Sequence, residues 1–474
     1  MKRVVIIGSG FGGLVCALLL GRRGYRVTVL ERQRQPGGCL QSYRRGGFAF
    51  DTGLHYIGGL GKGQPLHSLF EDLGLLQLPW RRMDADGFDR VTIGSETFSF
   101  AQGFSQFADT LAQRFPSDRD ALQRYAGLLR DLPSVQEIGE IAAYKYLAEN
   151  FSDPLLVNVL AGTSLKTELR RDSLPLFHFA HGQSSYIQSS WRLQGEGSLL
   201  VQQLLSAIVA TGGTLYCESE VETLTECDGR IVAARCSNGL SVEGDYFISD
   251  VHPAVTFSWI RESQVLKKLF RRRITMLPNT YGMFTASLVL KPGLLSYFNH
   301  NKYIYRQANV WQTPLLFSST ADAPQVDRVM VSARVPDNDS PYVRQIDLLT
   351  PMPWSLCQHW EQTIIGRRGS DYQALKQRLA AACISLAEEQ LPGLAAAIDC
   401  VYTSTPLTYR DYTLTPQGSA YGLRHDCRSL LLTMLSPRTP ISNLLLTGQN
   451  LILHGVEGVA MTAQRTVSEL IALG

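Results

Sequence analysis

Six residues near the start of the chain have the types and spacing needed to bind a pyrophosphate. The turn Gly8-Ser9-Gly10-Phe11-Gly12-Gly13 follows an apolar run at residues 4–7 and opens a segment with helical periodicity. In such a unit the first glycine permits a tight turn, the second lets the main chain approach phosphate, and the last lets the helix pack against the strand. The amide groups at the N-terminus of the helix would then face negative charge.

Glu31 supplies a second part of the same site. It follows a second expected strand, residues 25–30, whose apolar residues are Val27, Val29 and Leu30. Its position is close to the offset of about 20 residues at which an acidic side chain binds a ribose hydroxyl. Because strand, turn, helix, second strand and acid occur in register, the sequence predicts a dinucleotide-binding domain.

The residues after Glu31 favour FAD over a nicotinamide dinucleotide. Arg32 and the pair Gly37-Gly38 belong to a basic, glycine-containing loop, where a nicotinamide domain would normally continue with its next strand–helix–strand unit. A second main-chain loop and an arginine suit a longer cofactor that must be enclosed. We find no covalent-flavin cysteine motif near the C-terminus, so we expect non-covalent FAD.

These motifs resemble a known superfamily. The Glu31-Arg32 and Gly37-Gly38 pattern is similar to that of the FAD-binding group that includes amine oxidases, protoporphyrinogen oxidase and phytoene desaturases. Residues 50–59, FDTGLHYIGG, resemble a segment of the retinol saturase and carotenoid isomerase branch that passes near the flavin. Residues 220–249 resemble the middle FAD segment, and residues 447–458 the closing motif. The resemblance implies cofactor-binding roles for Gly8, Ser9, Gly10, Phe11, Gly12, Gly13, Glu31, Arg32, Gly37, Gly38, Gly53, Leu54, His55, Val221, Gly448, Gln449, Gly455, Val456, Gly458 and Val459.

The closing motif has a physical purpose. A helix expected to begin near Gly458 would point its amide donors at the cofactor and stabilise the negative charge that reduced flavin carries at its pyrimidine end. Gly455 and Gly458 could also serve a tight strand-to-helix turn, and the two interpretations are compatible.

Catalytic side chains are not identified by the sequence. His55, Tyr56, His454 and Glu457 lie in segments expected near the flavin ring, and reduction of a carbon–carbon double bond would require a proton donor. A structural role is the favoured interpretation for each. Arg192 lies where desaturase relatives carry an aromatic–Pro–Arg–Gly-Gly stretch, but the proline and the glycine pair are missing here, which puts a carried-over role in doubt.

Composition restricts the classes of partner. The 474 residues carry a formal net charge of +3, which gives no argument for nucleic acid. No apolar run is long enough to span a membrane, and the N-terminal run breaks at Gly8 unlike a secretory signal, so we expect a cytoplasmic protein. The nine cysteines form no CxxC pair, which indicates free thiols. His178 and His181 have HxxH spacing but no obvious third ligand, so no metal site is expected.

A basic cluster leaves one further contact open. Residues 267–273 contain two lysines and three arginines, with apolar residues between them and on either side. The cluster could rest on an anionic membrane surface and admit a lipid substrate, although a solvated helix face is the favoured interpretation.

The expected fold class is α/β, with α/β patterns at both ends and in the middle of the chain. A Rossmann-like, glutathione-reductase-like FAD-binding domain, with its βαβ unit in a three-layer sandwich, is expected from residues 1–70, 190–260 and 420–474. An inserted α+β substrate domain would comprise residues 71–189 and 261–419. We expect loops over residues 33–63 and mostly helix over 66–141. The other principal expected elements are strands at 214–217, 220–226, 230–236, 241–248, 281–290, 302–305, 328–335, 343–349 and 443–446, and helices at 12–23, 199–211, 370–391 with Ser370 as N-cap, and 458–473.

The resemblance implies an FAD-dependent oxidoreductase that reduces, desaturates or isomerises carbon–carbon double bonds of a small apolar polyene or isoprenoid. Amine or protoporphyrinogen oxidation is a second hypothesis, which an aromatic cage of two tyrosines facing the flavin would favour. A flavin-binding redox sensor is the non-enzymatic hypothesis. The electron partner, whether NAD(P)H, a quinone or oxygen, and the oligomeric state are not indicated by the sequence.

Overall fold

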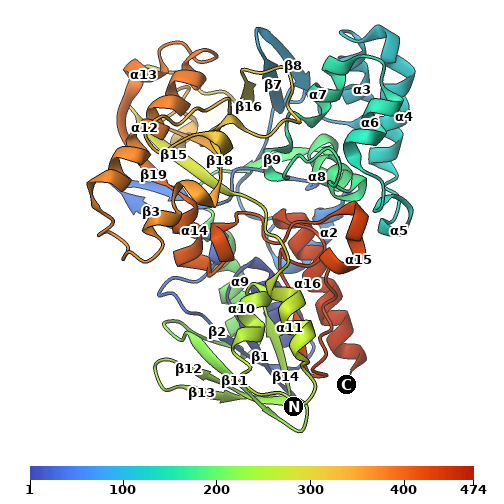
Figure 1. Cartoon of the computed structure of the whole chain (residues 1–474), viewed down its shortest axis with the longest axis vertical. Helices are drawn as coiled ribbons and strands as arrows, with labels where there is room; N and C mark the ends of the chain where they lie inside the picture. Colours follow the sequence, from blue (N-terminus) through green and yellow to red (C-terminus); the bar gives the residue numbers. More distant parts are fainter. Residues whose placement is uncertain (474) are drawn as a thin grey trace.

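The computed structural model describes residues 1–473, which form a lower and an upper lobe in Figure 1. The lower lobe contains both chain termini and a five-stranded parallel sheet of order β10-β2-β1-β14-β20. Its strands are apolar because the sheet is covered on both faces. Their bounds are β1 (Arg3–Ile7), β2 (Arg26–Leu30), β10 (Thr214–Tyr216), β14 (Tyr246–Ser249) and β20 (Leu444–Leu446).

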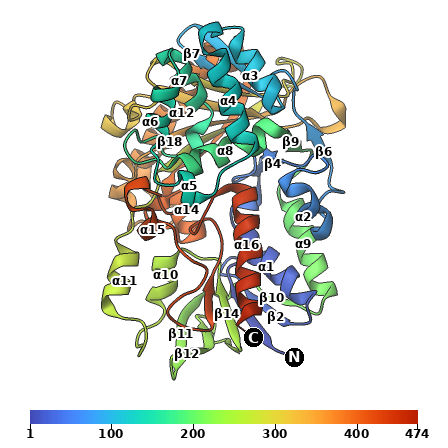
Figure 2. The same cartoon turned by 90° about the vertical axis from the view of Figure 1, so that its right-hand side faces the viewer.

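Helices cover one face of this sheet. The helices are α1 (Phe11–Gly21), α2 (Pro65–Leu73), α9 (Ser198–Ala210) and α16 (Gly455–Ala472). α1 lies beside α16 in Figure 2, and Val4 and Ile6 of β1 pack into the same core as Leu14 of α1 and Ala463 of α16. The helix α16, which was expected to begin at residue 458, begins three residues earlier, at Gly455.

A three-stranded antiparallel sheet lies on the other face. It comprises β11 (Val221–Cys227), β12 (Arg230–Cys236) and β13 (Ser241–Glu243). Val5 and Ile7 of β1 pack with Leu224 and Ile231 in this second core. Helices, parallel sheet and antiparallel sheet are the three layers expected from the sequence.

One expected strand is divided between these two sheets. Residues 241–248 were expected to form one strand, but β13 pairs with β12 whereas β14 pairs with β1. Gly244 and Asp245 separate the two strands. The chain crosses from the antiparallel to the parallel sheet at Gly244. A Cβ there would lie only 2.9 Å from the Val5 side chain, so a glycine suits this position.

The upper lobe is built on a seven-stranded mixed sheet of order β19-β15-β18-β17-β16-β7-β8. Tyr303 and Ile304 of β16 point into different cores, as alternation along a strand requires. One face packs against α12 (Gly369–Glu388), whose N-cap is Arg368 rather than Ser370. The strands are β7 (Asp89–Ile93), β8 (Glu96–Phe100), β15 (Gly282–Leu290), β16 (Asn301–Tyr305), β17 (Arg328–Ala333), β18 (Gln345–Met352) and β19 (Ile398–Ser404).

A bundle of short helices packs against the other face of that sheet (Figures 1 and 2). It contains α3 (Phe104–Ala112), α4 (Arg119–Arg130), α5 (Val135–Ile138), α6 (Ala143–Asn150), α7 (Pro154–Ala161) and α8 (Leu176–Gln188). The remaining helices are α10 (Pro253–Ser258), α11 (Lys268–Thr275), α13 (Leu394–Ala397), α14 (Pro406–Thr413) and α15 (Leu430–Thr433).

Two expectations for residues 33–141 were wrong. The region expected to be mostly helical also contains the edge strands β7 and β8 and the short β6 (Trp80–Arg82). β7 pairs with β16, more than two hundred residues away, so local periodicity could not reveal it. The region expected to be loops contains β3 (Ser42–Arg45), β4 (Phe48–Asp51) and β5 (Ile57–Gly58), of which β5 and β6 both pair with β9 (Ser190–Leu193).

Within residues 1–473, no helix is both long and apolar enough to cross a membrane.

Arg192 of β9 is buried and joins β9 to the start of β16 and the residues before it. Only 2% of its surface is exposed. Its guanidinium donates hydrogen bonds to the carbonyls of Phe298 (3.1 Å) and His300 (2.9 Å) and to Oδ1 of Asn301 (2.7 Å). These contacts give Arg192 a structural function that its sequence context left in doubt.

We expect Arg192→Met to lower the free energy of unfolding by about 3 kcal/mol or more, because it leaves buried acceptors without a donor. Urea denaturation followed by circular dichroism measures the change. The control is Arg306→Met, which removes an exposed ion pair with Glu389 and should cost no more than about 1 kcal/mol. Equal effects of the two substitutions would contradict this prediction.

Candidate active site

A pocket of about 260 Å³ lies at the carboxyl ends of β1 and β2. β1 lies between β2 and β14 in the sheet. The order of strands therefore runs away from β1 in both directions. Open α/β sheets bind ligands at such a switch point. The pocket is therefore where the sequence motifs predict a dinucleotide.

The structure brings most predicted cofactor residues to this pocket. Leu54 and Gly458 line a second cavity instead, and Gly13 lines neither. The predicted residues that line the first pocket are Gly8, Ser9, Gly10, Phe11, Gly12, Glu31, Arg32, Gly37, Gly38, Gly53, His55, Val221, Gly448, Gln449, Gly455, Val456 and Val459.

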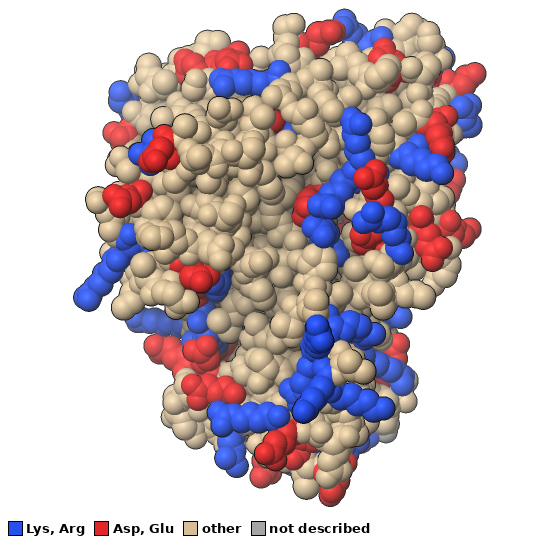
Figure 3. Space-filling view, viewed as in Figure 1, with Lys and Arg blue, Asp and Glu red and all other residues tan. Residues whose placement is uncertain are grey.

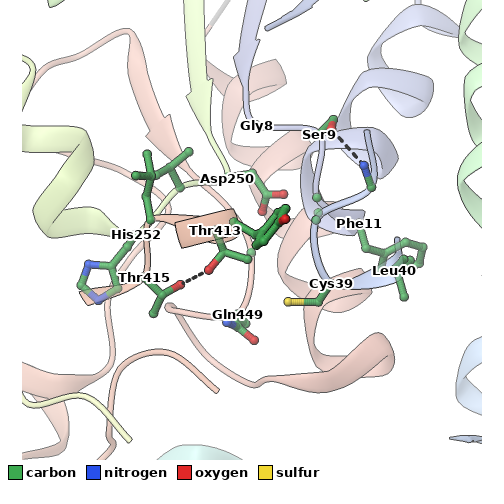
Figure 4. Close-up of a pocket in the computed structure, with 18 of the residues that line it drawn as sticks. Gly8, Ser9, Phe11, Cys39, Leu40, Asp250, His252, Thr413, Thr415 and Gln449 are labelled. Atoms are coloured by element: carbon green, nitrogen blue, oxygen red, sulfur yellow. Dashed lines mark hydrogen bonds between the residues drawn. The ribbon is translucent and has the colours of Figure 1, made fainter. Parts of the chain in front are cut away.

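Ser9 joins three parts of the predicted cradle. Its amide and hydroxyl groups both donate to Oε2 of Glu31, at 3.0 and 2.5 Å. The same hydroxyl accepts a hydrogen bond from the Gly37 amide at 3.1 Å, which Figure 4 shows. The Gln33 amide donates to the other Glu31 oxygen at 2.7 Å. The turn, the acid and the second glycine loop are thus held together before any ligand binds.

The glycines of the turn serve different purposes. Gly8 has a φ of 94°, which a residue with a side chain rarely adopts. Gly10 has an ordinary backbone conformation, but a Cβ there would collide with the Asp250 carboxylate. A Cβ at Gly13 would collide with the Gly8 carbonyl, so Gly13 allows the close packing of helix and strand rather than contact with a ligand.

Asp250 is a pocket residue that the sequence analysis missed. It follows β14 and lies between the glycine turn and Thr413 (Figure 4). Burial raises the pKa of Asp250 to about 7, and the negative charge of Glu31 adds to this effect, whereas a hydrogen bond from Gly13 opposes it. A signal was available in the sequence, because Asp250 lies two residues after the end of the strand expected at 241–248.

A segment from the upper lobe closes the pocket. Tyr409 and Tyr412 of α14, and Thr413, Leu414 and Thr415 at its end, all line it. The Arg32 guanidinium donates to the Asp411 carbonyl and lies 3.8 Å from Glu220. Arg32 therefore lines the pocket while it also fastens this segment to the lower lobe.

A second cavity of about 150 Å³ adjoins the first. The two share the lining residues Gly53, His55, Leu349, Tyr421, Gly455 and Val456. The second cavity is mainly apolar and aromatic, with Tyr186, Met283 and Met330 in its wall. All four weak catalytic candidates, His55, Tyr56, His454 and Glu457, line it.

Tyr56 is held in a buried polar network. Its hydroxyl donates to Asp89 at 2.9 Å and lies 2.9 Å from the Tyr303 hydroxyl. Asn301 Nδ2 donates to the other Asp89 oxygen at 2.8 Å. Burial raises the pKa of Asp89 to about 6 and raises that of Tyr56 well above its ordinary value. Tyr56 therefore keeps its proton.

The histidines at the cavity are uncharged at neutral pH. Burial lowers the pKa of His55 to about 4 and that of His454 to about 3. The two histidines with HxxH spacing make ring contacts instead: His178 stacks on His425 with ring centroids 4.0 Å apart, and the His181 ring lies tilted against Phe177. No group of three metal-ligating side chains occurs in residues 1–473.

Lys166 is a second residue that the sequence analysis missed. Its Nζ atom lies 3.2 Å from the ring centroid of Tyr186 and 5.2 Å from that of Tyr56. Burial lowers the pKa of Lys166 to about 7, which Asp89 and Glu457 partly oppose. Burial also raises the pKa of Glu457, which is in the first turn of α16 and forms a hydrogen bond with Ser185. The only sequence signal for Lys166 was a lone lysine beside apolar residues.

Residues 6–73 match the family model described as an NAD(P)-binding Rossmann-like domain. The chain is 24% identical to all-trans-retinol 13,14-reductase of Homo sapiens, over 97% of this chain and 84% of that protein. It is 24% identical to chloroplastic prolycopene isomerase of Daucus carota, over 98% and 80% of the two chains. It is 21% identical to 4,4'-diapophytoene desaturase (4,4'-diapolycopene-forming) of Methylomonas sp, over 91% and 87%.

Two solved structures have the same fold. An oxidoreductase from Methanosarcina mazei superposes with a TM-score of 0.68 at 16% identity, over 98% of this chain and 100% of that one. A triple mutant of putrescine oxidase gives 0.66 at 14% identity, over 100% and 99%. The expected resemblance is confirmed: over nearly its whole length, this chain is related to oxidoreductases named for retinol reduction, prolycopene isomerisation and diapophytoene desaturation.

Proposed function

We propose that this protein is an FAD-dependent oxidoreductase that acts on carbon–carbon double bonds of a polyene or isoprenoid. The observation that carries the proposal is an apolar, aromatic cavity that adjoins the dinucleotide pocket at Gly455 and Val456. A polyene in this cavity would lie beside the cofactor. The relatives named for retinol, prolycopene and diapophytoene support this substrate class.

The pocket residues fit FAD. The N-cap residue Gly10 has no side chain that could cap α1, and of the first-turn amides only that of Gly13 is described as bonded to a side chain, Asp250, so the other amide donors are available to the pyrophosphate. Glu31 would bind the ribose, and Val221 would lie at the adenine. Asp250, with a pKa of about 7, can be protonated beside a phosphate and so avoid repulsion. Bound FAD would supply the hydride chemistry.

The residues of the chain would shield the reaction and supply a proton. His55 and His454 are poor acids at neutral pH because burial keeps them uncharged. Glu457 has a raised pKa and can hold a proton at a pH where an exposed glutamate has lost it. We therefore favour Glu457, among the four candidates, as the group that protonates a substrate carbon. Its place in the first turn of α16 holds it at the cavity wall.

The position of Lys166 argues against an amine substrate. Two tyrosine rings, Tyr56 and Tyr186, line the cavity with centroids 4.5 Å apart. The chain's own ammonium group already lies over both rings, and a cationic amine would be repelled by it. Amine oxidation is therefore the less favoured function. The cavity likewise gives no support to a redox sensor without a substrate.

We also propose a cytoplasmic location with peripheral contact to an anionic membrane. Lys and Arg side chains gather over α11 on the face shown in Figure 3. Among them Leu269 and Met276 are 78% and 69% exposed. The neighbouring helix α15 exposes Leu431, and it lies above α11 in Figures 1 and 2. Exposed apolar side chains surrounded by basic ones suit the surface of such a bilayer.

Substitution of Gly10 tests the cofactor pocket. We expect Gly10→Ala to weaken FAD binding roughly 5- to 150-fold, because overpacking costs about 1–3 kcal/mol. Flavin absorbance retained after gel filtration, and Kd from FAD titration of the stripped protein, measure the loss. Gly127→Ala, on an open face of α4, is the control. Undiminished FAD binding by Gly10→Ala would place the cofactor elsewhere.

Anaerobic turnover tests the reaction. We expect the purified yellow protein, supplied with a retinoid or carotenoid and either NAD(P)H or a quinone, to change the polyene's absorption spectrum and flavin absorbance together. Mass spectrometry of the product gives the direction: a gain of two hydrogens, a loss of two, or none for isomerisation. Turnover of amines without any change in polyenes would refute the proposal.

Vesicle binding tests the membrane surface. We expect cosedimentation with phosphatidylcholine vesicles only when phosphatidylserine is included, and weaker binding at high salt. Lys268→Ala should weaken binding about fivefold, because each surface lysine contributes about 1 kcal/mol. Leu269→Glu should weaken it further, whereas Lys145→Ala on α6 should have no effect. Equal binding by all variants would rule out α11 as the contact.

A further inference from the structure

Lys166 has donors that no protein atom accepts. It lies in the short segment between α7 and α8, and its ammonium group forms no hydrogen bond or ion pair with any atom of residues 1–473. Its described contacts are with the faces of Tyr186 and Tyr56. A ring face attracts a cation but does not accept all three of its hydrogen atoms.

The nearby carboxylates do not complete the pairing. Asp89 already accepts hydrogen bonds from Tyr56 and Asn301. Glu457 forms a hydrogen bond with Ser185. Both act on Lys166 only through their charge, and neither has an oxygen within 4 Å of Nζ. The ammonium donors therefore face the cavity.

A hydrocarbon polyene would be a poor ligand for the part of the second cavity that Lys166 lines. If it filled the cavity, water would leave Lys166 and nothing would replace it, which is costly for a charged group. A ligand with an oxygen atom at one end would supply the missing acceptor. Lys166 lines only the second cavity and not the shared part with Gly455 and Val456. Such a ligand would have its polar end at Lys166 and its double bonds directed toward the dinucleotide pocket.

We propose that Lys166 is a specificity-determining residue that binds the terminal oxygen of an oxygenated polyene, a carboxylate or an alcohol, and selects against hydrocarbon polyenes. This inference rests on the proposed function and narrows its substrate class. Tyr186 stacks under the ammonium group and fixes its position, whereas Tyr56 is itself fixed by Asp89.

The test compares three ligands that differ at one end: retinoic acid, retinol, and the hydrocarbon in which the CH₂OH group of retinol is replaced by CH₃. Kd is measured from quenching of the protein fluorescence of the flavin-loaded enzyme without a reductant. We expect the wild type to bind both oxygenated ligands about tenfold or more tightly than the hydrocarbon, because their oxygens accept from a charged donor.

Lys166→Met removes the charge and donors while nearly keeping the side chain's length. It should abolish the preference while binding the hydrocarbon at least as tightly as the wild type, which shows that the variant is folded. Lys166→Arg should restore part of the preference. The matched control is Lys302→Met, a half-buried lysine over the ring of Phe298 that does not line the cavity; it should behave as wild type.

Two results would overturn the inference, and they differ in what else they affect. If wild type and Lys166→Met bind all three ligands in the same ratio, Lys166 does not select the end group, although the polyene function stands. If the wild type binds none of the ligands, the inference fails, and the proposed function fails with it if carotenoids are not turned over either.

Discussion

The dinucleotide pocket depends on main-chain amide groups at the start of α1 that a ligand can reach. A helix N-terminus attracts a phosphate only if no side chain stands in front of it. Gly10 and Gly12 add no side chain there, and neither could carry one, because a Cβ at either position would collide with the Asp250 carboxylate. The Ser9 hydroxyl then fixes Glu31 and Gly37 around the same opening. The rest of the lower lobe positions these few groups, since the parallel sheet brings the ends of β1, β2 and β14 to one edge.

Burial also determines the charges that a substrate would meet. The same loss of water that lowers the pKa of His55 and His454 raises the pKa of Glu457. Uncharged histidines are compatible with an apolar ligand, whereas charged histidines would not be, and a raised pKa favours the protonated form of Glu457 more than in an exposed glutamate. Burial also lowers the pKa of Lys166, to about 7, and the charges of Asp89 and Glu457 oppose this only in part. The wall of the cavity is thus mainly apolar and aromatic, and Lys166 contributes an amino group to it.

The sequence predicted the lower lobe well because its signals are local. The run at residues 4–7, the glycine turn and Glu31 occur within one strand–helix–strand unit. Most predicted cofactor residues consequently line one pocket. β7 was missed because its partner β16 is distant in sequence. The helix α16 was expected too late because the glycines of its first turn disguise its start.

Asp250 and Lys166 were missed for a related reason. Neither belongs to a recognisable motif, and each acquires its environment only when separate elements pack around it.

The two lobes differ in how much of their function could be predicted from the sequence. The lower lobe supplies the amide donors, the acid and the glycines, whose function follows from geometry that any dinucleotide imposes. The upper lobe supplies what differs between substrates: Met283, Met330 and Leu349 from the seven-stranded sheet line the second cavity, as does Lys166 from the helical layer. The end of α14 reaches back over the first pocket, where Arg32 holds its Asp411 carbonyl. Each pocket is therefore built from both lobes. The glycine turn, Glu31 and Gly37, however, belong to the lower lobe alone. A change at Met283, Met330 or Lys166 can therefore alter the second cavity without altering those residues.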